Sequence, residues 1–225
     1  ILKKNNRYKI YKKIIDILIN LKKINNIKTV DLNGKYYRMK KYDHKDLYKE
    51  ADLFNKWYTP YYNKRLAEPY KKKKIRKILN VLIKRLKLPN NTFVHRDFHV
   101  SNMIYKNKKI YLIDSQDAVI GNPAYDLASL IDDVRYTSSN LLKKKVYSYF
   151  LEKNKKIDRK SFEHDFLILS VLRNLKILGI FTRLAKRDKK KNYLKFIPYT
   201  WKLIKLRTFG NKIFDELVSC INSKN

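Results

Sequence analysis

Several polar residues that could do chemistry lie within one short stretch of this sequence, VHRDFHVSNMIYKNKKIYLIDSQDA, at residues 94–118. Asp97 comes five positions before Asn102, and a second aspartate, Asp114, follows the run KIYLI. These three side chains converge if the extended runs of this stretch form a hairpin. Carboxylate and amide oxygens are hard ligands of the kind that Mg²⁺ needs. A positioned carboxylate can also accept the proton of a hydroxyl nucleophile. The pattern therefore predicts phosphoryl transfer, in which the protein positions the groups and stabilises charge.

Each member of this polar block has a predicted role. Asp97 is the candidate catalytic base, because it lies in a loop after the extended run TFVH. Asn102 and Asp114 are the candidate ligands for a metal ion on nucleotide phosphates. His95 is interpreted as a buried hydrogen-bonding scaffold of the loop rather than as a base. Asp117 has two interpretations that the sequence does not separate, a substrate-binding residue or the cap of a following turn.

The elements that must position these residues are mostly helical. Apolar residues recur at helical spacing in 8–24, 47–58 (ending at Pro60), 75–86 (ending before Pro89), 124–135, 141–153, 160–186 and 193–208. The runs TFVH, NMIY and KIYLID are short and extended, and Asn33-Gly34 between two β-forming runs predicts a separate hairpin. The predicted fold class is α+β, with a small β-hairpin that carries the polar block, and residues 1–225 form a single lobe.

Composition excludes some classes of protein and leaves others open. A chain of 225 residues with 44% hydrophobic residues is long and apolar enough to bury a core. Cys220 is the only cysteine, so neither an intrachain disulfide nor a cysteine-based zinc site is possible, and a reducing, cytoplasmic compartment is expected. No uncharged apolar run reaches roughly 18 residues, so we predict no transmembrane helix and no membrane partner.

The formal net charge of +34 would attract polyanions. However, Lys, Asn, Ile and Tyr dominate the chain, and all four have A/T-rich codons. The positive charge is also spread along the whole length rather than gathered into one stripe. We therefore do not expect nucleic-acid binding to be the primary role.

The polar block resembles the aminoglycoside phosphotransferase and choline-kinase-like branch of the protein-kinase-like fold. That family has a catalytic loop H-x-D-x-x-x-x-N and a metal motif in which a strand ends in I-D. The motifs stand here as His95-Arg96-Asp97 with Asn102, and Ile113-Asp114. The segment GNPAYDLASL also matches, and the resemblance implies that Asp126 opens a helix and braces the catalytic loop. It further implies ATP and Mg²⁺ as cofactors.

A closer likeness is to the bacterial kinases that phosphorylate N-acetylmuramate and N-acetylglucosamine at the anomeric hydroxyl in cell-wall recycling. HRDFHVSN, IDSQDAVIGNPAYDL and RNLKILGIFTRLAKRDKKKNYLKFIP carry this likeness, which extends over residues 7–208. One departure is Ser115, where that subfamily tends to have an aromatic residue; this alters packing more than chemistry. The resemblance implies an amino-sugar hydroxyl as the acceptor.

Arginines are the candidates for holding an anionic group of the acceptor, such as a lactyl carboxylate. In so basic a chain, the sequence by itself favours a solvated or packing role for each of them. The candidates are Arg135, Arg173 and Arg183.

A kinase of this kind also has a lobe that covers the nucleotide, with a glycine-rich loop, a strand lysine and a helix glutamate. None of these is visible in the sequence, where the four glycines are scattered and few residues precede the first predicted helix. The first residue is Ile1 rather than Met. We therefore expect the C-terminal lobe of a longer kinase, a fragment whose N-terminal nucleotide lobe is supplied by the same or a companion chain.

Two alternatives stay open at this point. One is a basic nucleic-acid or ribosome-binding module in which the kinase-like residues are vestigial. The other is an inactive kinase remnant. The sequence also does not separate N-acetylmuramate from N-acetylglucosamine, aminoglycosides or another hydroxylated metabolite, because acceptor choice depends on the shape of the pocket.

Overall fold

The computed structural model describes residues 6–24, 28–30 and 33–222 of the chain. The chain divides into two compact units. The first unit comprises Ile1–Tyr42 with Lys87–Phe166, and the second unit comprises Asp43–Leu86 with Leu167–Asn225. Helices predominate and the strands form small antiparallel pairs, which confirms the predicted α+β class.

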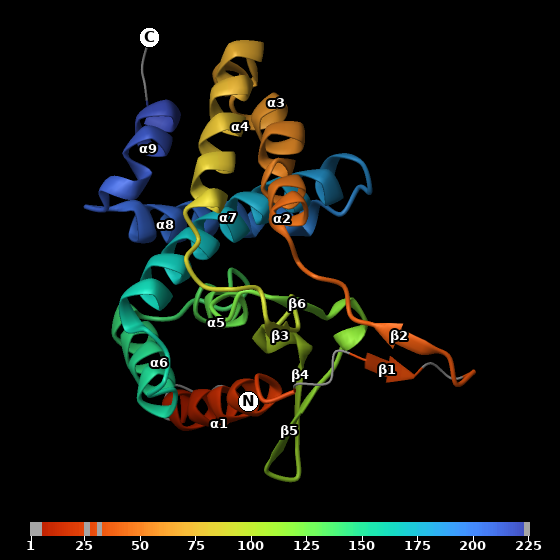
Figure 1. The fold of residues 1–225 in the computed structure, drawn as a ribbon. Helices are drawn as coiled ribbons and strands as arrows, with labels where there is room; N and C mark the ends of the chain where they lie inside the picture. The colour runs from red at the N-terminus through yellow and green to blue at the C-terminus, as the bar shows by residue number, and fades with distance from the viewer. Residues whose placement is uncertain (1–5, 25–27, 31–32, 223–225) are drawn as a thin grey trace. The chain divides into compact units, whose positions relative to one another are not determined.

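The first unit contains all the described strands and the polar block of the sequence (Figure 1). Its elements are α1 (Arg7–Leu21), β1 (Lys28–Val30), β2 (Tyr36–Arg38), β3 (Thr92–Val94), β4 (Met103–Lys106), β5 (Lys109–Leu112), β6 (Val119–Gly121), α5 (Tyr125–Ile131), α6 (Asn140–Lys153) and the beginning of α7 (Arg159–Lys186). Short 3₁₀ turns lie at Val100–Asn102 and Ser115–Asp117.

Helix α1 follows the apolar spacing of its sequence. It buries one face, and that face packs against α6. The buried residues of α1 are Ile10, Tyr11, Ile14, Ile15 and Leu18. Lys22, directly after the helix, places its ammonium over the Phe150 ring of α6 and donates to the Pro123 carbonyl at 2.5 Å. Helix α1 is thereby tied to the segment that leads into α5.

Three antiparallel strand pairs make up the β structure. The pair β4–β5 is the predicted hairpin, with Met103 opposite Leu112 and a turn at Asn107 and Lys108. The pair β1–β2 confirms the hairpin around Asn33-Gly34, although residues 31–32 of its loop lie outside the described part. The third pair, β3–β6, joins Val94 to Val119 and was not predicted from the sequence.

The secondary-structure elements described in the second unit are all helical. Its elements are α2 (His44–Ala51), a π-helical turn (Phe54–Tyr58), α3 (Thr59–Tyr62), a 3₁₀ turn (Lys64–Ala67), α4 (Pro69–Lys84), the remainder of α7, a 3₁₀ helix (Lys191–Phe196), α8 (Ile197–Thr208), a 3₁₀ turn (Lys212–Phe214) and α9 (Asp215–Asn222). Helix α4 contacts both α2 and α9.

The prediction that Pro60 ends a helix was wrong. Pro60 lies in the first turn of α3, directly after the π-helical turn. The chain continues from α2 through the π-helical turn into α3 without an extended break. A π-helical turn shifts the regular hydrogen-bond ladder, and here that shift comes directly before the residue that has no N–H.

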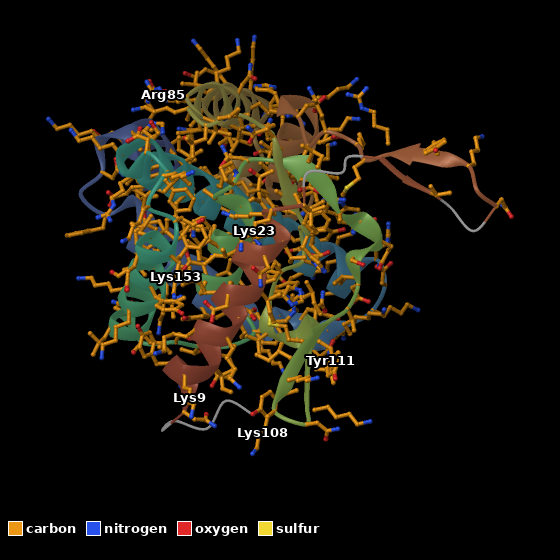
Figure 2. The ribbon with its side chains drawn as sticks, turned by 60° about the horizontal axis from the view of Figure 1, so that its bottom comes forward. Lys9, Lys23, Arg85, Lys108, Tyr111 and Lys153 are labelled. Atoms are coloured by element: carbon orange, nitrogen blue, oxygen red, sulfur yellow. The ribbon has the colours of Figure 1, made fainter. Side chains whose placement is uncertain are left out.

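The basic residues extend outward from many elements rather than from one face. Figure 2 shows Lys9 on α1, Lys23 just after that helix, Lys108 at the tip of the β4–β5 hairpin and Lys153 on α6. This spread agrees with the distribution of charge along the sequence. Among the residues that the structure describes, no helix has both the length and the apolar character needed to cross a membrane.

Candidate active site

The β4–β5 hairpin brings the two predicted metal ligands to the same end of the first unit's β structure. Met103 pairs with Leu112, so Asn102 and Ile113 come next on the two sides. The N–H of Ile113 donates to the carbonyl of Asn102 at 3.1 Å, which extends the ladder by one step. Asp114 follows with a left-handed backbone, φ +63°, which turns the chain away from the strand direction. Residues far apart in sequence are thus held as neighbours.

The loop 95–102, called here the Asp97 loop, is closed by short-range hydrogen bonds. The N–H of His99 donates to the Asp97 carbonyl at 3.0 Å, and the N–H of Asn102 donates to the His99 carbonyl at 3.0 Å. The side-chain amide of Asn102 also donates to the Asp97 carbonyl at 3.1 Å. Because the Asn102 nitrogen is engaged there, its side-chain oxygen is the atom left to bind a ligand.

Asp126 anchors the backbone of the Asp97 loop. Its carboxylate lies in the first turn of α5, is 1% exposed, and accepts from the N–H groups of His95 at 2.7 Å and Arg96 at 3.1 Å. Arg96 has φ +70°, a left-handed conformation that is costly for a side chain of its size. The two hydrogen bonds that Asp126 accepts hold the loop in this conformation.

Two further buried aspartates support the same region, and sequence reasoning missed both. Asp133 accepts from the N–H of Val100 in the Asp97 loop at 3.3 Å. Asp165 accepts from the side chain of Asn122 at 2.7 Å, and Asn122 in turn accepts from the N–H of Ala124 at 2.9 Å. Neither aspartate lies in a motif or at a fixed spacing from Asp97. Only the folded chain brings them to the loop and to the segment before α5.

His95 is fully buried and links the Asp97 loop to the end of β5. Its Nε2 lies 3.1 Å from the Ile113 carbonyl, a contact that requires a proton on Nε2. Burial lowers the pKa of His95, although the Ile113 hydrogen bond and the nearby Asp97 and Asp114 carboxylates act in the opposite direction. Burial thus favours the neutral side chain, which donates to this carbonyl.

The carboxylates of Asp97 and Asp114 are in a different situation from the buried aspartates. Within the described residues, neither carboxylate has a hydrogen bond or an ion pair, and no group of three or more His, Cys, Asp or Glu side chains could hold a metal ion. Asp114 is exposed and Asp97 is partly exposed. The Asn102 oxygen and the Asp114 carboxylate are the oxygens here that could hold Mg²⁺, which takes one or two protein oxygens and completes its shell with phosphate and water.

The remaining predicted site residues are distributed over both units. Asp117 is exposed, and its main-chain carbonyl accepts from the Arg96 guanidinium at 3.3 Å. Arg135 lies 4.0 Å from the Asp133 carboxylate. Arg183 belongs to the second unit, near the end of α7, where its Nε is buried without a hydrogen-bond partner among the described residues.

Comparison with known proteins agrees with this geometry. A family model described as the phosphotransferase enzyme family matches residues 2–151, about two thirds of the chain. The chain belongs to this family. The match covers the Asp97 loop, the β4–β5 hairpin and α5, so the catalytic-loop motif, the metal motif and the segment GNPAYDLASL lie inside it, whereas the third similar segment, residues 173–198, lies beyond it. The chain is therefore similar throughout this region to small-molecule kinases.

Individual relatives point to sugar kinases. An N-acetylmuramate/N-acetylglucosamine kinase of Caulobacter vibrioides is 37% identical over 114 residues, 48% of this chain and 31% of the relative. The proteins of the same name from Neisseria meningitidis serogroup B and Pseudomonas aeruginosa are 30% and 29% identical over 70% of this chain. Those matches cover 49% and 48% of the two relatives, so the chain spans about half the length of the curated relatives it matches.

Proposed function

We propose that this chain is part of an ATP-dependent kinase that phosphorylates the anomeric hydroxyl of an amino sugar, N-acetylmuramate or N-acetylglucosamine, in cell-wall recycling in the cytoplasm. The proposal rests on the family, on the names of the relatives and on the Asp97 loop. One observation carries it. In a chain with 54 lysines and arginines, Asp97 and Asp114 keep carboxylates without an ion pair among the described residues, on a backbone held by Asp126.

Asp97 is the proposed catalytic base. A carboxylate without competing hydrogen bonds can accept one from the sugar hydroxyl and then take its proton as the phosphoryl group is transferred. The loop backbone on both sides of Asp97 is fixed, through His95 and Arg96 to Asp126 and through Val100 to Asp133. The base is thus positioned without its carboxylate being used for structure.

Asn102 and Asp114 are the proposed ligands for Mg²⁺. When bound, the ion would neutralise charge on the phosphates of ATP. The chain contributes by orientation: the Asn102 side-chain nitrogen is engaged by the Asp97 carbonyl, and the left-handed backbone at Asp114 ends the strand at the carboxylate. Asp117, Arg135 and Arg183 remain candidates for substrate binding.

We further propose that an N-terminal lobe carrying the nucleotide-binding elements completes the kinase, in the same or a companion chain. The supporting fact is that the matches reach only 31–49% of the relatives' length. Any assay of turnover should therefore use the full-length gene product.

The test is ATP-dependent phosphorylation of N-acetylmuramate and N-acetylglucosamine by the full-length protein and its Asp97→Asn variant. Loss of the general base should lower kcat about 10²- to 10⁴-fold. Glu163→Gln is the matched control, because Glu163 is an exposed carboxylate of the same unit, and it should leave kcat within about twofold. Turnover that survives Asp97→Asn would rule out the proposed function.

The metal role has its own readout. Asp114→Asn removes the charged ligand and should raise the Mg²⁺ concentration needed for half-maximal turnover about 10-fold or more. An unchanged Mg²⁺ dependence with reduced kcat would assign Asp114 a role other than metal binding.

A further inference from the structure

Lys22, the residue that ends α1, places a positive charge on the buried side of that helix. Tyr11, Ile15 and Leu18 precede it at helical spacing, and all three side chains are almost completely buried. Lys22 itself is only partly exposed. An apolar side chain is expected at such a position, because taking an ammonium group out of water costs free energy unless other groups replace the water.

Three groups of the first unit surround the Lys22 ammonium. It donates to the Pro123 carbonyl at 2.5 Å, and it lies 4.2 Å from the centroid of the Phe150 ring and 5.5 Å from that of the Phe162 ring. The two rings are stacked on each other, with centroids 5.1 Å apart. A carbonyl oxygen and aromatic faces attract an ammonium more strongly than a neutral amine. These contacts therefore depend on the proton of Lys22.

No carboxylate forms an ion pair with Lys22 among the residues that the structure describes. Burial lowers the pKa of Lys22 to about 7, although the Asp126 carboxylate acts in the opposite direction. Other charged side chains line the same cavity as Lys22, and they are Lys23, Glu152, Lys153, Lys155, Lys156 and Asp158. Lys22 thus gains or loses its proton close to neutral pH.

The Pro123 carbonyl depends on Lys22 because the helix provides no donor for it. Ala128 donates its N–H to the Ala124 carbonyl, as in a regular helix. The Pro123 carbonyl, one residue earlier, accepts from the Lys22 ammonium alone within the described part of the chain. The start of α5 is therefore fixed in part by a charged side chain from α1.

The segment that Lys22 fixes also holds the Asp97 loop. Asn122, directly before Pro123, donates to the buried Asp165 carboxylate at 2.7 Å. Asp126, in the first turn of α5, accepts from two backbone N–H groups of the Asp97 loop at 2.7 and 3.1 Å. A shift of the Pro123 carbonyl would therefore reach the carboxylate that anchors this loop.

We propose that Lys22 is a positioning residue for catalysis, whose protonated side chain holds the start of α5, and through Asp126 the Asp97 loop, in the active arrangement. This inference rests on the proposed function, in which Asp97 is the base. Lys22 acts through Pro123 and Asp126 rather than on the reacting groups. When Lys22 loses its proton, the start of α5 is held less firmly, and turnover falls.

The experiment measures kcat for sugar phosphorylation from about pH 6 to about pH 8.5, with the full-length protein and the variants Lys22→Met and Lys22→Arg. In the unmodified protein, kcat should fall about fivefold over this range as the charge is lost. Lys22→Met has no charge at any pH, so its kcat should be about fivefold low at pH 6 and should approach that of the unmodified protein at pH 8.5. Lys22→Arg stays charged and should not show the fall.

Lys23→Met is the matched control. Lys23 is the exposed neighbour of Lys22 and lines the same cavity, and its ammonium donates to the Asn20 side chain. The variant should keep the pH profile of the unmodified protein. Effects of pH on ATP and on Asp97 are common to all four proteins, so the comparison isolates Lys22.

Amide hydrogen exchange gives a second readout, which does not depend on turnover. The N–H groups of His95 and Arg96 donate to Asp126, so their protection reports how firmly the loop is held. At about pH 6, Lys22→Met should lower this protection about fivefold, and Lys23→Met should leave it within twofold. Amides of α4, in the second unit, should keep their protection in both variants.

Three results would overturn the proposal. One is a kcat of Lys22→Met within twofold of the unmodified protein at pH 6, and another is an alkaline fall in kcat that persists in Lys22→Arg. The third is protection of His95 and Arg96 that Lys22→Met leaves unchanged or lowers no more than that of α4, which would assign Lys22 to overall stability. Failure of the proposed function is distinct, because it shows as turnover that survives Asp97→Asn.

Discussion

The Asp97 loop in the first unit and the middle of α7 in the second unit both depend on buried polar groups, but the two regions differ in how those groups are satisfied. In the first unit, Asp126 and Asp165 are almost completely buried and accept from two or more donors of the chain itself. On α7, Arg173 and Asn174 are equally buried and have unpaired atoms.

Under the proposed function, this difference is one between polar groups that are used for structure and polar groups that are left to bind a ligand. A buried carboxylate that is saturated by backbone N–H groups determines a loop conformation and has no capacity left for a ligand. A polar group left without a partner, like the Asp97 carboxylate near the surface or the Arg173 guanidinium in the interior, retains that capacity.

Asp126→Ala should have the largest effect on stability of the variants that test whether the buried aspartates of the first unit are structural. It would leave the N–H groups of His95 and Arg96 without acceptors and would release the left-handed backbone at Arg96. Each orphaned donor costs about 1–3 kcal/mol, so we expect the free energy of unfolding to fall by about 2–5 kcal/mol. Urea denaturation measures this.

Asp126→Asn is the companion variant. It keeps one acceptor of the two and should lose less stability than Asp126→Ala. If both variants retain the stability of the unmodified protein, Asp126 does not anchor the loop.

Gly179→Ala tests whether α7 is held rigidly near the Arg173–Asn174 pair. The added methyl group would overlap the Leu53 carbonyl, and overpacking of this kind costs about 1–3 kcal/mol. Thermal unfolding should show the loss. Ala185→Gly is an informative counterpart at another buried position of the same helix, because it would cost about 1 kcal/mol through helix propensity with no overlap. A neutral Gly179→Ala would show that α7 and Leu53 can move apart.

The pH dependence of stability tests whether His95 is a structural group that is neutral when the protein is folded. Its pKa is lowered in the folded protein, so as pH falls below about 6.5 the unfolded chain takes up the proton first. The stability that neutral His95 contributes is thus fully present above about pH 6.5. It is lost as pH falls from there toward the lowered pKa of the folded protein. Over that range the free energy of unfolding should fall by at most about 1.4 kcal/mol per pH unit.

His95→Gln keeps a donor for the Ile113 carbonyl but does not titrate. Denaturation curves between pH 7.5 and 5.5 should therefore be flatter for this variant than for the unmodified protein. Identical pH profiles would mean that His95 is not the group that titrates.

The smallest expected effect is that of Asp97→Asn on stability. Because the Asp97 carboxylate has no hydrogen bond or ion pair among the described residues, its neutralisation should change the free energy of unfolding by less than about 0.5 kcal/mol while kcat collapses. A loss comparable to that of Asp126→Ala would place Asp97 among the structural aspartates.

Much of the helical fold could be predicted from the sequence, because helical spacing of apolar residues is a local property. The helices α1, α4, α6 and α7 lie where the pattern predicts them, and the KNK turn between β4 and β5 was also predictable. The error at Pro60 has a local cause as well, since the residue is compatible with both the end and the first turn of a helix. The pairing of β3 with β6 depends on contacts between distant segments and carried no such signal.

The sequence by itself determined which side chains could do chemistry: the order and spacing of His95, Asp97, Asn102 and Asp114 already matched a known arrangement for phosphoryl transfer. Only the tertiary structure decided which polar groups find hydrogen-bond partners within the chain. Asp126, Asp133 and Asp165 find backbone donors that lie tens of residues away. Arg173 is indistinguishable in sequence from many solvated cations, but it is buried, and its Nη1 atom has no hydrogen-bond partner among the residues that the structure describes. Burial and hydrogen-bond partners are properties of the packed chain, because they depend on segments that meet only when it folds.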